Sequence, residues 1–143
     1  MPTRQRPQHD SPAAIRQALA LAFDMLERYE PWHEVNVYSN GWLAGALNAA
    51  FRLDVAGNVY LRGVLTAAGG APKGNGTVAF TLPDGYRPAL PVTLPTVGSS
   101  ALGAFYTGLI QIATSGNVTL TLRGLAVNAA VGDIALAGTF RVF

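Results

Sequence analysis

The sequence contains no cysteine, which excludes disulfide bonds, zinc–thiolate sites and cysteine nucleophiles. Charged residues make up only 13% of the 143 residues, about half of the usual share, while 50% are hydrophobic. A disordered chain has the opposite composition, so we expect a folded domain. No run of about 18 apolar residues is present, and no basic segment leads into an apolar one. We therefore expect neither a transmembrane helix nor a secretory signal peptide.

Neither sign of charge dominates. The chain has ten Lys+Arg residues and eight Asp+Glu residues, which gives a net charge of +2 at pH 7, and Lys73 is the single lysine. The basic residues do not cluster along the chain. Because a nucleic-acid interface needs a basic patch, we expect no nucleic-acid partner.

Glycine is missing from the first 40 residues, because all 16 glycines lie at Gly41 or later. The first 30 residues instead carry eight of the charged residues. This break predicts three regions: a flexible arm over residues 1–10, a helix over residues 11–30 and a β domain over residues 31–143. We expect the arm and the helix to attach the chain to a partner or to assemble its copies.

The region before Pro31 has the signals of an amphipathic helix. Ser11 and Pro12 suit the helix start, and Glu30 precedes a proline, which helices avoid. Apolar residues recur at spacings of four and three, which is a heptad seam. We expect this seam to join copies of the chain; the alternative is that it packs on the chain's own domain. The seam consists of Ile15, Leu19, Ala22, Leu26 and Tyr29.

After Pro31 the hydrophobic period changes to two, which indicates β-strands. Turn residues separate the runs, and no helical pattern intervenes. This arrangement predicts an antiparallel β-sandwich or barrel. The runs are 59–65, 78–82, 110–113, 118–122, 134–136 and 140–142, and the turns are 54–58, 83–85, 115–117 and Gly132-Asp133.

No catalytic constellation is visible. His9 and His33 stand apart, and neither has a second ligand at metal-binding spacing. Asp54, Asp84 and Asp133 fall in the predicted turns, where aspartate serves the backbone geometry. We expect no enzyme activity, no metal and no cofactor.

A saccharide site is the ligand site that the composition favours, because aromatic rings stack on sugars and polar groups bind their hydroxyls. The alternative is that the aromatic residues lie in the core or between subunits. The glycine-rich loop over residues 69–76 is long enough to contribute to such a site. The candidate ligand-binding residues are Tyr86, Tyr106, Lys73 and Asn75.

Four stretches resemble one family when they are read in order. They are Asn40-Gly41-Trp42, FRLDVAGNVYLRGV at 51–64, FTLPDGYRP at 80–88 and IQIATSGNV at 110–118. Together they resemble the β domain of tail-fibre, tail-tip and receptor-binding proteins of long-tailed bacteriophages, notably those that infect actinobacteria. Two features depart from the family pattern: Leu53 stands where a basic residue is common, and the last 20 residues lack an aromatic-rich ending.

The resemblance implies a virion protein, assembled in the host cytoplasm, that forms a homotrimer on an N-terminal stalk. It implies that residues 1–30 contact other virion proteins and that the β domain binds a host cell-surface saccharide. A capsid decoration or head-fibre protein is one alternative, and a non-viral carbohydrate-binding module is another. Arg62 and Arg87 are expected to fix turns by pairing with Asp54, with Asp84 or with backbone carbonyl groups.

Overall fold

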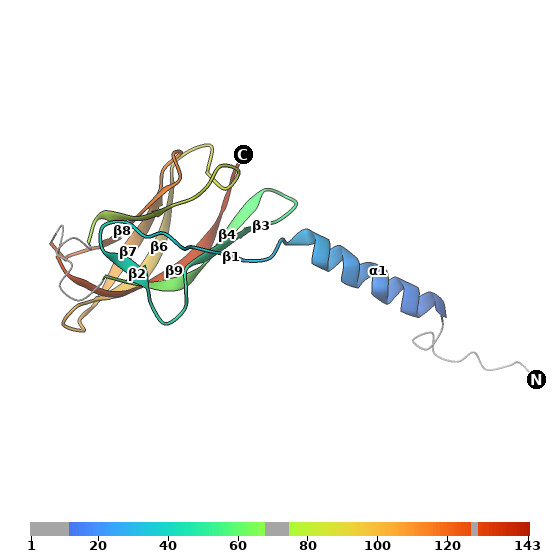
Figure 1. Cartoon of the computed structure of the whole chain (residues 1–143), viewed down its shortest axis with the longest axis horizontal. Coiled ribbons are helices and arrows are strands. Elements are labelled where there is room, and N and C mark those ends of the chain that lie inside the picture. Colours follow the sequence, from blue (N-terminus) through green and yellow to red (C-terminus); the bar gives the residue numbers. More distant parts are fainter. Residues whose placement is uncertain (1–11, 68–74, 127–128) are drawn as a thin grey trace, which may run out of the picture.

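The computed structural model describes residues 12–67, 75–126 and 129–143, with the backbone alone for residues 23–28. The helix α1 extends away from the strands, which together form a unit that we call the head (Figure 1). The elements are α1 (Pro12–Arg28), β1 (His33–Glu34), β2 (Trp42–Ala44), β3 (Ala50–Leu53), β4 (Asn58–Ala67), β5 (Thr77–Thr81), β6 (Val92–Ser100), β7 (Phe105–Ile112), β8 (Asn117–Leu122) and β9 (Val131–Arg141).

The strands form one curled antiparallel sheet in the order β1-β3-β4-β9-β6-β7-β8-β5. β4 lies near the middle and is paired along both edges. β9 takes one edge from Asn58 to Thr66, while β3 and then β2 share the other. The sheet curls into a half-barrel, so its two ends, β1 and β5, approach each other.

The segment before β2 spans the opening between these two ends. The Ser39 backbone N–H donates to the Ala79 carbonyl over 2.7 Å, and the Asn40 amide donates to the Val78 carbonyl. Trp42 completes the link, since its indole N–H donates to Thr77 Oγ1 over 2.9 Å while the ring is buried in the core. Trp42, from the first motif of the resemblance, thus closes the half-barrel.

The core lies inside the curl and follows the alternation of the strands. Every second residue of β4, from Val59 to Ala67, is buried, and the same holds for β8. Gly63 occupies one inward position of β4. A Cβ there would lie 2.6 Å from the Ala49 Cα, so glycine is needed for the chain between β2 and β3 to cross the strand this closely.

The predicted fold class is confirmed: the protein is mainly β and antiparallel, with a short helix near the N-terminus. One predicted turn is wrong, because Gly132 and Asp133 lie inside β9. The last two apolar runs therefore belong to a single strand.

Candidate functional site

The helix meets the head through a stack of aromatic rings and guanidinium groups, which we call the joint. The Arg52 Cζ lies 4.4 Å from the ring centroid of Tyr29 and 4.4 Å from that of Trp32. The Arg62 Cζ lies 4.3 Å from the Trp32 centroid. Each contact is worth about 0.5–2 kcal/mol. The prediction for Arg62 is wrong: within the described residues it stacks on Trp32, and its buried Nε has no carboxylate or carbonyl partner.

The turn between β3 and β4 lies next to the joint, since Asp54 forms a β-bridge with Tyr29. The Asp54 carboxylate accepts hydrogen bonds from the Ala56 and Asn58 backbone N–H groups, from the Asn58 amide and from the Tyr60 hydroxyl. These bonds, the Asn58 N–H first, lower the pKa of Asp54. The same contact raises the pKa of Tyr60 to about 12. Asp54 therefore serves the turn, as the sequence predicts.

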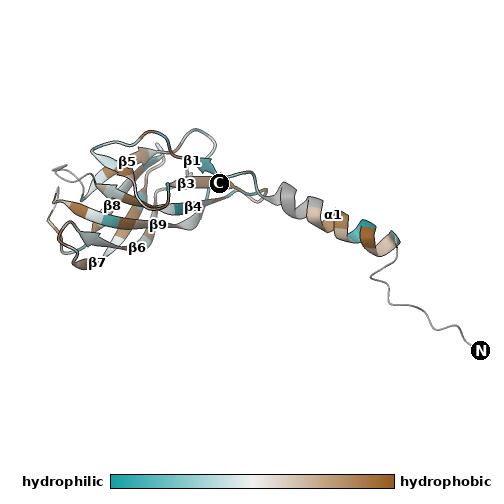
Figure 2. Cartoon of the chain, turned by 60° about the horizontal axis from the view of Figure 1, so that its bottom comes forward, coloured by the Kyte–Doolittle hydropathy of each residue, from teal (hydrophilic) through white to brown (hydrophobic). Residues whose placement is uncertain are grey.

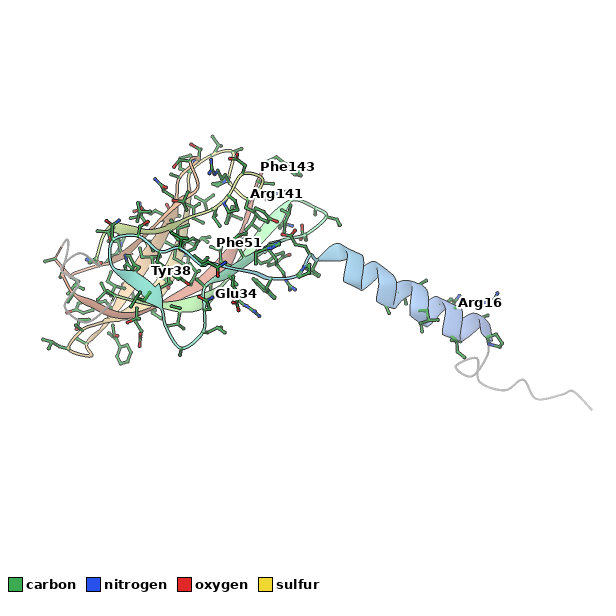
Figure 3. The ribbon with its side chains drawn as sticks, in the orientation of Figure 1. Arg16, Glu34, Tyr38, Phe51, Arg141 and Phe143 are labelled. Carbon is green, nitrogen blue, oxygen red and sulfur yellow. The ribbon has the colours of Figure 1, made fainter. Side chains whose placement is uncertain are left out.

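Tyr86 lies at the same end of the head as the joint. Its ring packs edge-on against Phe51, with centroids 4.8 Å apart, and its hydroxyl lies 3.2 Å from His33 Nε2. Burial and the hydrogen bond to Glu30 raise the pKa of Tyr86 to about 12. Figure 3 labels Phe51 within the head. Tyr86 is thus engaged in packing the head.

Arg87 fixes the turn that carries Tyr86. Its guanidinium lies 2.8 Å from the Asp84 carboxylate, and its Nε–H donates to the Leu82 carbonyl over 2.8 Å. The predicted turn-fixing role of Arg87 is confirmed. Gly116, from the β7–β8 turn, packs against the same Leu82 carbonyl, so the third and fourth motifs of the resemblance meet here.

The remaining candidate ligand residues do not form a common site with Tyr86. Asn75 is 1% exposed, and its amide donates to the carbonyls of Leu122, Leu125 and Ala126 while its oxygen accepts from the Leu122 N–H. It therefore ties chain segments together and offers no group to a ligand. Tyr106 packs against the core from β7, and Lys73 lies outside the described residues.

A groove of about 350 Å³ lies beside the β6–β7 hairpin, at the end of the head that points away from α1 (Figure 1). The residues that line it include Val97, Ser99, Phe105 and Asp133. The groove was not predicted from the sequence, because Asp133 was assigned to a turn and Tyr106, not Phe105, was named as a candidate ligand-binding residue. The signal in the sequence is the spacing of Val131 and Ile134, which are both buried although three positions apart.

The helical seam remains open in the described part of the chain. Ile15 and Leu19 are each 53% exposed, and Figure 2 shows hydrophobic stretches on α1 although the helix points away from the head. The alternative that the seam packs on its own domain is therefore wrong for these residues. Tyr29 differs, since it follows the helix and belongs to the joint. Ala22 is exposed, and the Leu26 side chain lies outside the described residues.

The described residues hold neither a metal-ligand cluster nor a membrane-spanning helix. They contain no cluster of three His, Cys, Asp or Glu side chains that would hold a metal ion. Over the same ranges, no helix has the length and apolarity that crossing a membrane requires.

No family model matches the chain, and no curated protein matches it. A solved structure does match: the receptor binding protein (gp15) of Listeria phage PSA, with a TM-score of 0.54 and 19% identity over 94% of this chain and 82% of that one. The fold resembles that of a phage receptor-binding protein. At this identity the likeness concerns the fold. The four motifs resemble the same class of protein.

Proposed function

We propose that the chain is a structural protein of a bacteriophage virion, a tail appendage whose N-terminal segment attaches and whose head faces outward. The likeness to a phage receptor binding protein over 94% of the chain carries this proposal. The motif resemblance supports it independently, because it rests on residues rather than on backbone shape. The layout agrees as well, with an exposed helix at one end of a curled β head.

The proposed appendage is a homotrimer held in part by α1. Exposed apolar side chains on a helix that leaves the head favour a helical bundle between copies, since water penalises an open seam. Light scattering on the full chain is expected to give three times the monomer mass of 15.0 kDa. A monomer at micromolar concentration would contradict this part of the proposal.

The head is proposed to meet a saccharide on the host surface. An exposed aromatic ring beside free polar groups, at the end away from the helix, supports this role. No catalytic role is proposed.

Immunogold labelling tests the location. Antibodies against the full chain are applied to particles purified from a culture that produces it, and label at the tail or its fibres is expected. Label over the capsid would favour the decoration or head-fibre alternative. Particles without label would refute the virion role and favour a non-viral carbohydrate-binding module. Deleting residues 1–10 is expected to lower the label while the head keeps its melting temperature.

A further inference from the structure

The groove at the far end of the head combines an apolar floor with two polar groups on its walls. Val64 of β4, Val97 of β6 and Ala135 of β9 form the floor. Asp133 and the Ser99 hydroxyl stand at one side. A volume of about 350 Å³ is within the range of small-ligand sites.

A β-bulge lies beside Asp133 at this groove. The pairing of β6 with β9 is regular at Gly98 and Ile134 and then shifts, so that Ser100 pairs with Val131. The extra residue on β9 lets both Val131 and Ile134 face inward, while Asp133 points outward in ordinary alternation with Ile134. The Asp133 backbone N–H donates to Ser99 Oγ over 3.1 Å. Bulges of this kind re-aim side chains and occur beside functional sites. The Asp133 carboxylate is exposed and has no hydrogen-bond or ion-pair partner within residues 12–67, 75–126 and 129–143.

Phe105 supplies the other wall. It opens β7 with 86% of its surface exposed, while the next residue, Tyr106, turns inward and packs on the core. An aromatic ring left so open loses most of the apolar contact it would gain from burial, which points to contact with something outside the chain. The backbone of the β6–β7 turn is itself well held, because the Ser100 N–H donates to the Ala104 carbonyl and the Gly103 N–H to the Ser100 carbonyl.

We propose that this groove binds an uncharged or amine-bearing saccharide, an inference that rests on the proposed role of the head at the host surface. A sugar ring places C–H groups against the Phe105 face and directs hydroxyl or ammonium donors to the Asp133 carboxylate. A uronic acid or a phosphate-bearing polymer would instead set a second negative charge against Asp133, and no cation lines the groove within the described residues to offset it.

A second copy of the chain is the competing occupant. The groove continues into a shallow apolar strip along Pro95 and Ala137, which a flat interface would suit. A contact between copies would however bury the unpaired Asp133 carboxylate, and the centres of interfaces are depleted of charge. The free carboxylate therefore favours the saccharide.

The test applies the full chain to an array of defined glycans that end in N-acetylglucosamine, rhamnose, glucosamine or glucuronic acid. Binding to neutral or amino sugars, without binding to glucuronic acid, is expected. Phe105→Ala and Asp133→Asn should each weaken the best hit by about tenfold or more, since each removes one recognition element. Leu102→Ala is the matched control, because Leu102 is 99% exposed on the same hairpin but does not line the groove.

Melting curves of the variants confirm that the head is folded, as expected for changes at exposed positions. Binding that survives both groove variants, a preference for glucuronic acid, or no binding at millimolar glycan would each overturn the inference. A fall in solution mass on Phe105→Ala would also overturn it, by assigning the groove to a second copy. Virion labelling does not depend on these outcomes, so failure of the site and failure of the proposed function remain distinguishable.

Discussion

The helix and the head treat their apolar side chains in opposite ways. In the head, Leu65 and Ile110 are fully buried inside the curled sheet, whereas on α1 Ile15 and Leu19 keep 53% of their surface exposed. Both segments come from the same weakly charged chain. The head buries the alternating apolar residues of its strands within one chain, and the helix has a seam that only another molecule can cover. This difference separates a folding unit from an assembly unit.

The two units meet at the joint, which is built from aromatic rings and guanidinium groups and not from the apolar residues of the strands or of the helical seam. Tyr29 and Trp32 pack on Arg52 and Arg62 on the outer face of β3 and β4, not in the core. The Leu53 N–H also donates to the Glu30 carboxylate over 2.9 Å. In the described part of the chain, the helix is therefore anchored to the head through the residues that follow its C-terminal end, which leaves the described residues of its first half open to partners.

Leu19→Asp is the change that breaks the assembly unit most completely. An aspartate in an apolar seam would lose its hydration without a partner, at a cost of about 2–4 kcal/mol in each copy. The solution mass is expected to fall to that of the monomer while the melting temperature of the head stays the same. Gln17→Asp is the matched control, because it adds the same charge on the opposite face of α1. An unchanged mass for Leu19→Asp would show that the seam does not join copies.

Trp42→Ala is the corresponding change in the head, where it should destabilise the fold. The buried indole fills the opening of the half-barrel and donates to Thr77, so its loss leaves a cavity and should lower the free energy of unfolding by about 3–5 kcal/mol. Urea unfolding followed by circular dichroism measures the change. Val37→Ala, at a position that is 79% exposed in the same segment, should change the stability by less than about 0.5 kcal/mol. A loss below about 1 kcal/mol for Trp42→Ala would contradict the closing role.

Local signals in the sequence predicted the elements whose residues all obey one pattern. Pro12 and Pro31 bracket α1, and the alternation from Val59 to Leu65 predicted most of β4. β6 escaped prediction because Pro95 interrupts its pattern, and β9 was predicted only as two separate runs because Gly132 and Asp133 resemble a turn. The short strands β1, β2 and β3 are not among the predicted runs either.

The contacts of the site were harder to predict than the strands. Arg52 and Arg62 reach the same Trp32 ring because β3 and β4 pair in one register, with Ala50 opposite Arg62. Nothing in the spacing of these residues along the chain fixes that register. Likewise, whether Phe105 or Tyr106 faces outward depends on the phase of β7, and a shift of one residue exchanges the two.

Trp32→Ala tests the joint and should have a smaller effect than either change above. It removes the ring between two guanidinium groups, so the free energy of unfolding should fall by about 1–2 kcal/mol. Because the chain lacks cysteine, Arg16→Cys and Val55→Cys place two spin labels uniquely on α1 and on the head. Their distance distribution should broaden in Trp32→Ala and stay narrow in Trp32→Phe, which keeps a ring. Equal widths in all three proteins would show that the stack does not orient the helix.

The smallest expected effect is the pH dependence of the turn below the joint. The hydrogen bonds from Asn58, Tyr60 and Ala56 hold the pKa of Asp54 below its usual value of about 3.9, so the folded state prefers the ionised carboxylate. Its contribution to stability is present above about pH 4 and is lost as the pH falls through the folded-state pKa. Tyr60 has the opposite sign: its pKa of about 12 exceeds the usual value of about 10, so its contribution is lost as the pH rises from about 10 to about 12.

Asp54→Asn separates charge from geometry at this turn, since the asparagine oxygen still accepts from the Ala56 and Asn58 N–H groups. Urea unfolding across the pH range measures the free energy of unfolding. Its fall at low pH (the acid limb) should disappear in Asp54→Asn. Its fall at high pH (the alkaline limb) should disappear in Tyr60→Phe, in which the acid limb should also become shallower. The helix signal should follow the same two limbs, because Tyr29 pairs with Asp54 at the joint. Acid and alkaline limbs that persist in both variants would mean that other groups set the pH dependence and that the turn does not couple the helix to the head.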